Sequence, residues 1–208
     1  MKKVFKSILL ILSIFIFTQN VVADEQIKLK EHFLKKIDNI IVVVQNDNLS
    51  KSQRNNEIIN ILEPTFDFEL MAKLSLGKIW KKLSNEDKTR FVTLYIERMK
   101  QSYSSKVDGY GGEKVKVIKI NQAKSNRIAL VTDLVGEDES LEIVYKFYKP
   151  KKLKSDKDSW LIYDAEIKGV SILKTDKAQF REFLKTKSIS ELMDALVKNV
   201  NTSSQHIE

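Results

Sequence analysis

The sequence predicts an α+β fold, in which helices pack against a twisted antiparallel sheet of about four strands. Two changes of hydrophobic period carry this prediction. Up to about residue 105, apolar residues recur every three or four positions, which is typical of helices with one buried face. Between residues 115 and 167 they alternate with polar residues, as in strands, and the remaining chain returns to helical spacing. Separate runs of helices and strands indicate the α+β class.

Residues 1–23 have the features of a cleaved signal peptide. Lysines at the start precede an uncharged apolar run over residues 8–17, and Val21 and Ala23 follow at the small-residue spacing that signal peptidase needs. A bilayer-spanning helix takes about 20 apolar residues, so this run is too short for one. We therefore expect export and cleavage after Ala23, rather than an uncleaved anchor.

The rest of the chain, residues 24–208, is expected to fold as a single domain around one core. It contains no further apolar stretch of membrane-spanning length and no cysteine. The lack of cysteine excludes disulfides, cysteine-ligated metals and a lipid-modified N-terminal cysteine. Residues 201–208 are polar and are expected to form a flexible tail.

The chain is basic, with 36 Lys and Arg against 28 Asp and Glu and a formal net charge of +8. Few of the basic residues are arginine, whereas phosphate and base recognition favour the arginine fork. Together with the expected export, this argues against nucleic acid as a partner. The lysines are expected mainly to form a solvated surface, with weak attraction to anionic lipid or to an acidic protein as the alternative.

Four helices are predicted before the first strand. An apolar stripe from Leu29 to Val44 marks the first helix. Ser50 and Ser84 are placed to cap the second and the fourth, and Pro64 closes the second. The approximate ranges are 29–44, 51–62, 68–76 and 85–103.

Four strands follow the helices. The alternation slips by one residue at Ile118, which indicates a β-bulge. Residues 136–139 are expected to form a hairpin turn, and Gly169 begins a short extended piece. Two further helices end the chain, the second capped by Ser190. The strands are expected at about 115–120, 128–134, 141–147 and 160–167, and the last helices at about 176–185 and 190–200.

Both faces of the central strands are largely apolar. Ala129 and Val131 occupy outward-pointing positions in one strand, and Val144 does so in the next. A sheet covered by helices on both sides explains this pattern, and so does a sheet whose concave face lines a cavity. The pattern alone favours the covered sheet.

The sequence contains no convincing catalytic or metal-binding constellation. His32 and His206 lack partners at ligand spacing, and Ser171 lacks the second glycine of a nucleophile elbow. Asp164 is the best candidate for a general base, but an acid satisfied by a nearby turn is the favoured interpretation. We therefore expect no enzymatic activity, no metal and no cofactor.

Three segments carry a resemblance to a known family. They are FDFELMAKLSLGKIW at residues 66–80, WLIYD at residues 160–164 and GVSI at residues 169–172. In this order they resemble the MlaC, or toluene-tolerance (Ttg2-type), family of periplasmic phospholipid-binding proteins, over about residues 27–197. The sequence departs from the family at residues 175–180, where an N-Y-R-x-x-F pattern is replaced by TDKAQF.

The resemblance implies an NTF2-like fold, in which the sheet and the helices enclose an apolar cavity. It implies a soluble periplasmic monomer that shuttles phospholipid between an outer-membrane lipoprotein complex and an inner-membrane ABC transporter complex, and so maintains outer-membrane lipid asymmetry. The phospholipid is then cargo and not a cofactor, and the apolar strand faces are interpreted as cavity lining. The residues expected to line the cavity are Leu74, Trp80, Tyr95, Met99, Tyr103, Val131, Leu141, Val144, Tyr145, Phe147 and Tyr163.

Two alternatives stay open. One is an NTF2-like enzyme that acts on a hydrophobic small molecule, with Asp164 or another cavity acid as its base. The other is an accessory subunit of an ABC transporter that binds only proteins. A deep, dry and uncharged cavity is expected for the lipid carrier, and a short cavity with a paired acid and donor for the enzyme.

Overall fold

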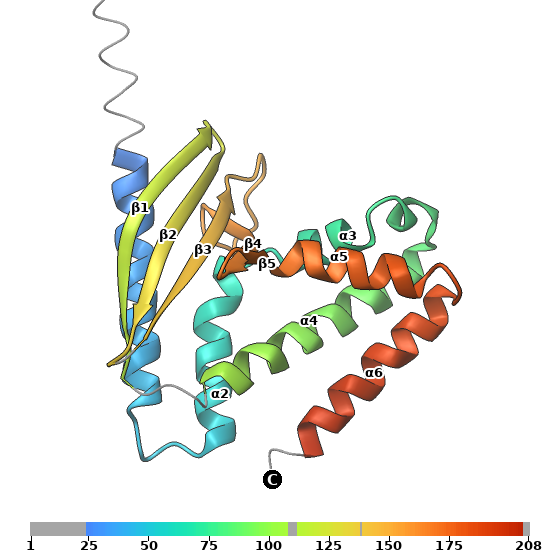
Figure 1. Ribbon diagram of the computed structural model, residues 1–208, viewed down its shortest axis with the longest axis horizontal. Coiled ribbons are helices and arrows are strands. Elements are labelled where there is room, and N and C mark those ends of the chain that lie inside the picture. Colours follow the sequence, from blue (N-terminus) through green and yellow to red (C-terminus); the bar gives the residue numbers. More distant parts are fainter. Residues whose placement is uncertain (1–23, 108–111, 138, 206–208) are drawn as a thin grey trace, which may run out of the picture.

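The computed structural model describes residues 24–107, 112–137 and 139–205. The expected signal peptide, residues 1–23, and the last three residues of the expected tail lie outside these ranges. A five-stranded antiparallel sheet stands beside a group of helices, as Figure 1 shows. The predicted α+β class is confirmed.

The sheet is a meander whose strand order follows the chain. The register between β1 and β2 shifts between Val117 and Lys119, which confirms the bulge predicted at Ile118. A fifth short strand, beyond the four expected, follows a tight turn in which Lys168 and Gly169 both take positive φ, at 48° and 77°. The strands are β1 (Lys114–Lys124), β2 (Arg127–Val135), β3 (Ser140–Tyr148), β4 (Leu161–Ile167) and β5 (Val170–Ser171).

The first two helices form an antiparallel pair. The N-terminal helix covers residues 24–44, and α2 (Lys51–Leu62) begins at the predicted cap Ser50. The Lys36 ammonium donates to the Ile61 carbonyl at 3.2 Å, so the two helices lie side by side. A 3₁₀ turn, η1 (Glu63–Thr65), then ends α2 at the proline that was expected to close it.

Three further elements lead to the sheet. They are α3 (Phe68–Leu76), the 3₁₀ turn η2 (Ile79–Lys82) and α4 (Asn85–Val107). Asp67 caps α3 by accepting from the Leu70 amide at 2.9 Å. Ser84 caps α4 as predicted, because its hydroxyl accepts from the Asp87 amide at 3.0 Å.

The last two helices differ from their predicted bounds. Helix α5 (Ile172–Phe183) starts four residues early, because the Ser171 hydroxyl accepts from the Lys174 amide and so caps it. Helix α6 (Ile189–Gln205) is capped by Ser188 and not by Ser190, so that prediction was wrong. Glu191 reaches back to the Ser188 amide at 2.8 Å and closes a capping box, which requires a spacing of three residues. Residues 201–205 of the expected tail form the last part of this helix.

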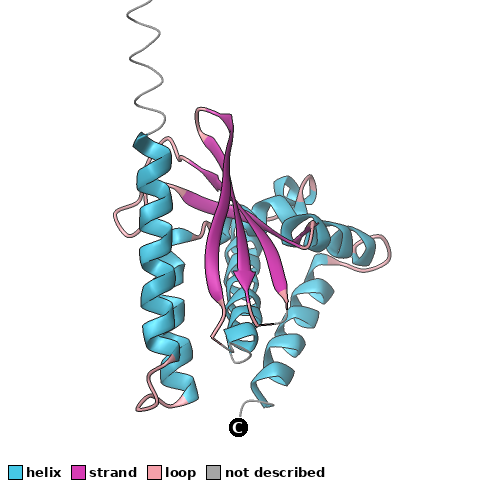
Figure 2. Ribbon diagram, turned by 60° about the vertical axis from the view of Figure 1, so that its left-hand side comes forward, coloured by secondary structure: helices cyan, strands magenta, loops and turns pink. Residues whose placement is uncertain are grey.

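One apolar core joins the sheet to the helices. Phe33 of the N-terminal helix packs on Tyr145 and Phe147 of β3, with ring centroids 4.8 and 6.2 Å apart. Farther along the core, Phe91 of α4 meets Phe180 of α5 edge-on at 5.8 Å. Figure 2 shows the N-terminal helix standing beside the sheet. Within the described ranges, no helix combines the length and the apolar composition that crossing a bilayer requires.

Candidate functional site

The inner face of the sheet, defined as the face that contacts the N-terminal helix, carries no charged side chain on β1, β2 or β3. Its polar groups are few, and two of them are satisfied within the protein. The Thr132 hydroxyl donates to the Ile143 carbonyl at 2.9 Å, and Gln26 of the N-terminal helix bonds Gln122 at 2.7 Å. The strand register assigns to this face Val115, Val117, Ile120, Gln122, Ile128, Leu130, Thr132, Leu134, Leu141, Ile143, Tyr145 and Phe147.

Packing on the inner face is complete at one end and incomplete at the other. Near the β1–β2 turn, Ile128, Leu130 and Phe147 are at most 2% exposed and lie in one core with Phe33. Toward the β2–β3 turn the apolar side chains are only half-buried. We call this set the apolar mouth: Val115, Val117, Leu134, Leu141 and Ile143 of the sheet, with half-buried Ile37, which packs against the core one helical turn past Phe33 on the same side of the N-terminal helix.

A groove of about 790 Å³ adjoins this end of the sheet. Leu134 and Leu141 of the apolar mouth are part of its wall. The remaining wall carries charges of both signs, from Lys114, Lys116, Lys168, Glu113, Glu137 and Glu139. An uncharged apolar surface therefore runs into a polar, solvent-facing groove, which is an arrangement that fits an amphipathic molecule.

Tyr145 is a further polar group of the inner face and lies opposite Leu130 of β2. Its ring packs on Phe33, and burial raises the pKa of its hydroxyl to about 12. The hydroxyl is therefore neutral at physiological pH. It offers a neutral donor on a face whose other polar side chains, Gln122 and Thr132, are also uncharged.

The structure brings three of the expected lining residues to the inner face: Leu141, Tyr145 and Phe147. Val131 and Val144 pair with each other on the opposite face of the sheet, because neighbouring residues of a strand point to opposite sides. Tyr163 is half-buried and stacks with the Arg127 guanidinium, whose central carbon lies 4.7 Å from the ring centroid.

The helical residues of the expected lining lie in several places. Tyr95 is fully buried and donates to Asp176 at 2.8 Å, in a region packed solid by aromatic rings. Met99 is 3% exposed in the same core, Trp80 is half-buried on η2, and Leu74 is 36% exposed on α3. The side chain of Tyr103 lies outside the described part of the molecule.

Most residues of the apolar mouth were not singled out from the sequence. The signal was present in two places. The apolar stripe of the first helix continues past Phe33 to Ile37, and Val115 and Val117 keep one parity before the bulge. Neither feature could be assigned to the mouth without knowing which face of the sheet meets the helix.

Asp164, the best candidate for a catalytic base, is held by its neighbours. It is 3% exposed and accepts from the Ser171 hydroxyl, the Leu173 amide at 3.1 Å and the Lys146 ammonium at 3.0 Å. Burial opposes the charge of Lys146, but hydrogen bonds to Glu166 and Asp164 outweigh it and raise its pKa. Asp164 pairs with Lys146 on the face of the sheet away from the apolar mouth.

Metal-ligating side chains do not gather in the described residues in groups of three or more. His32 is half-exposed and lies 3.1 Å from Asp158, in a cluster that also contains Lys36. Because an ammonium group occupies this carboxylate, the cluster is an ion-pair network and not a cation site.

Comparisons with known proteins complete this description. The chain is similar in structure to a phospholipid-binding protein from Ralstonia solanacearum, solved in complex with a phospholipid, with a TM-score of 0.70 and 14% identity. The match covers 84% of this chain and 97% of that chain. A comparison with curated proteins found no significant match. The family model described as MlaC protein matches residues 35–198, and the chain therefore belongs to the MlaC family.

Proposed function

We propose that this protein binds a phospholipid, with the acyl chains against the inner face of the sheet and the headgroup at the groove beside the apolar mouth. The observation that carries the proposal is the contrast along one uncharged face. Phe33, Leu130 and Phe147 fill one end, while the apolar mouth at the other end stays half-buried next to charged side chains. Apolar side chains left half-covered at such an opening gain contacts when a tail enters.

The energetics of lipid transfer explain why such a carrier needs an uncharged interior. Two acyl chains contain about 30 methylene groups, each costing about 0.8 kcal/mol to expose to water, so a free lipid in water costs on the order of 20 kcal/mol. A binding protein has to shield most of that surface, and a buried charge beside the tails would oppose this. The headgroup can remain hydrated among the lysines and glutamates of the groove.

Transport is the part of the proposal that reaches beyond binding. We propose that the chain is exported, loses residues 1–23, and shuttles phospholipid through the periplasm between an outer-membrane complex and an inner-membrane ABC transporter complex. Membership of the MlaC family, the signal-peptide features and the phospholipid bound to the Ralstonia solanacearum relative support this role.

The direct test is to extract the purified protein with organic solvent and to identify and count the released lipid by mass spectrometry. We expect roughly stoichiometric phospholipid from the wild type. Ile37→Glu places a charge in the apolar mouth and should reduce the bound lipid at least about tenfold, because the carboxylate must be desolvated beside the tails.

Val42→Glu is the matched control. Val42 is 67% exposed on the same helix, so the same substitution adds the same charge outside the mouth and should leave the lipid content unchanged. A wild-type protein that releases no phospholipid contradicts the proposal. So does an Ile37→Glu protein that stays folded, by circular dichroism, and keeps its full lipid content.

A further inference from the structure

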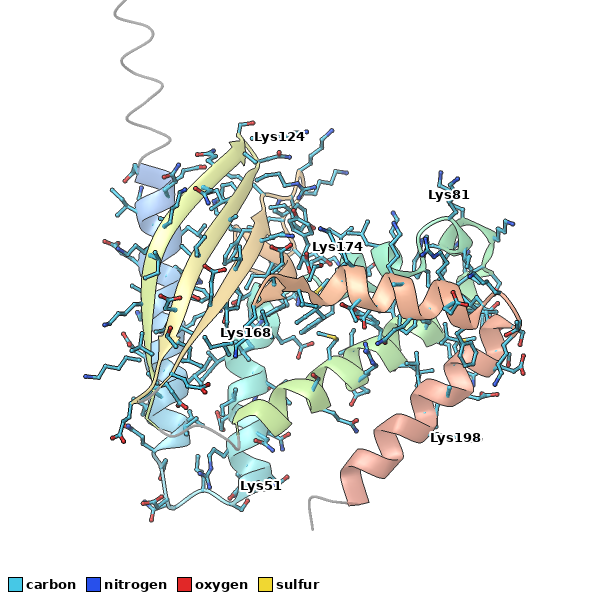
Figure 3. All side chains as sticks on the ribbon, in the orientation of Figure 1. Lys51, Lys81, Lys124, Lys168, Lys174 and Lys198 are labelled. Carbon is cyan, nitrogen blue, oxygen red and sulfur yellow. The ribbon has the colours of Figure 1, made fainter. Side chains whose placement is uncertain are left out.

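A second surface, built from α3, η2 and α5, is lined by lysines. We call it the lysine face: Lys73 of α3, Lys78, Lys81 and Lys82 at η2, and Lys174 and Lys177 of α5. All six are exposed. Helices α3 and α5 pack directly on each other, and Figure 3 shows Lys81 and Lys174 along the same edge of the helical part.

The lysines of this face are not neutralised by ion pairs in the part of the chain that the structure describes. None of its six ammonium groups forms an ion pair with another described residue. The acids on the same elements are engaged elsewhere: Glu69 pairs with Lys154 at 2.9 Å, Asp176 with Arg98 at 2.7 Å and Glu182 with Lys185 at 2.7 Å. Acids lie at its border, since Lys73 shares a groove with Asp67 and Glu69, but the six lysines outnumber them and leave the surface with a net positive charge.

At Gly77, the end of α3 lies against the Lys177 side chain of α5. Gly77 ends α3 with φ of 56°, and a Cβ at this position would stand 3.3 Å from the Cε of Lys177. The Lys177 side chain can thus lie across the carboxyl end of α3, where the helix dipole favours a cation. Lys177 is brought close to Lys78 in this way, although it comes from a different helix.

An apolar side chain lies within the lysine face. The exposed side of α3 carries Leu70, Lys73 and Leu74, and its other side is buried. Gly77 and Lys78 follow the end of the helix at the same spacing. Leu74 is 36% exposed between two lysines of this side. An exposed leucine bordered by ammonium groups is a common feature of helices that rest on a lipid surface.

We propose that the lysine face docks the protein on the surface of a bilayer that contains anionic phospholipid. Lysine is a compact, hydrated point charge without the planar fork of arginine, which suits a fluid layer of phosphates better than one fixed carboxylate or phosphate. Clusters of four to eight basic residues beside an apolar group typically bind anionic lipid surfaces. Leu74 then enters the headgroup layer. This docking surface does not depend on a lipid in the interior.

The test is co-sedimentation of the purified mature protein with large vesicles, made either of phosphatidylcholine alone or of phosphatidylcholine and phosphatidylglycerol in equal parts. We expect binding only to the anionic vesicles, and weaker binding as salt is added. A triple variant, K73Q/K78Q/K81Q, should bind on the order of 100-fold more weakly, since each lysine near an anionic surface contributes about fivefold. A matched triple variant, K35Q/K119Q/K124Q, loses the same charge elsewhere and should bind within about threefold of the wild type.

A second pair of variants tests the apolar contact at constant charge. Leu74→Ser should weaken binding several-fold, whereas Ile27→Ser, at a residue 54% exposed on the N-terminal helix, should not. Two results would overturn the proposal: an equal loss of vesicle binding in both triple variants, or no binding of the wild type to anionic vesicles at low salt. The lysine face would then be assigned to an acidic protein partner instead. The lipid content of each preparation separates the two proposals. Docking lost with lipid retained rejects only the docking surface, and lipid absent with docking intact rejects only the carrier.

Discussion

The buried carboxylate of Asp176 shows how a single residue stabilises the helical part of the molecule. It is 1% exposed on α5. It accepts hydrogen bonds from the Tyr95 hydroxyl at 2.8 Å and from the Arg98 guanidinium at 2.7 Å, both on α4. Asp176→Asn would leave a partly buried guanidinium without its counter-charge. We expect the free energy of unfolding in urea to fall by about 2–4 kcal/mol.

Asp194 provides the comparison for that measurement. It also pairs with an arginine of α4, Arg90 at 2.9 Å, but both side chains are about half-exposed. Asp194→Asn should lower the free energy of unfolding by less than about 1 kcal/mol, because water screens an exposed pair. Equal effects of the two substitutions would show that burial does not strengthen the Asp176 pair.

At the scale of elements, Asp158 ties the N-terminal helix to the loop before β4. Its carboxylate accepts hydrogen bonds from the Lys36 ammonium at 3.0 Å, from His32 at 3.1 Å and from the Thr65 hydroxyl at 2.8 Å. Burial alone would raise the pKa of Asp158, but these hydrogen bonds outweigh it and lower the pKa below its ordinary value. The folded state therefore binds this proton less readily than the unfolded chain does.

The free energy of unfolding should therefore depend on pH through Asp158. The contribution of Asp158 is present above the ordinary carboxyl pKa and is lost as the pH falls through the lowered one. We expect the urea midpoint of the wild type to fall between about pH 5 and pH 3, and to fall less steeply in Asp158→Asn. Asp156→Asn, at an exposed acid of the same loop, should keep the wild-type slope. A wild-type slope in Asp158→Asn would show that this carboxylate does not link the loop to the helix.

The sequence was a good guide to elements whose ends are set locally. Ser50, Asp67 and Ser84 start their helices because a cap needs only its own next three residues. At α6 two serines precede the periodic residues, and only the three-residue spacing to Glu191 makes Ser188 the cap. The start of α5 depends on Ser171 at the end of a strand that the pattern could not separate from its turn.

The candidate site was harder to predict, because spacing reports which way a side chain points and not whether space remains there. Tyr95 and Tyr145 both occupy inward positions. Tyr95 is enclosed because its hydroxyl bonds Asp176, which is 81 positions away, whereas Tyr145 lies beside the half-buried apolar mouth. Val131 and Val144 were grouped with inner-face residues because alternation alone does not identify the face that meets the N-terminal helix.

At the scale of the whole molecule, the bound lipid should act as part of the core. A ligand present at about 100 times its dissociation constant stabilises the folded state by about 2.7 kcal/mol. For a chain of this size that corresponds to a rise in Tm of roughly 5–10 °C. We therefore expect delipidated protein to unfold at a lower temperature, and added phospholipid to restore the original Tm, as measured by calorimetry.

Ile37→Glu should remove most of this difference, because its interior no longer accepts the tails. Val42→Glu should keep it. An identical Tm with and without lipid would mean that the tails do not contribute to the packed interior.

The bulge in β1 also bears on how this strand can change in evolution. Val117 and Lys119 occupy successive positions of the ladder, and Ile118 between them is 57% exposed. Deleting Ile118 would remove this bulge and leave Ile120 pointing inward, whereas deleting a residue inside a regular stretch would turn every later side chain over. Loss of one codon at this position should therefore be tolerated, with little change in the free energy of unfolding.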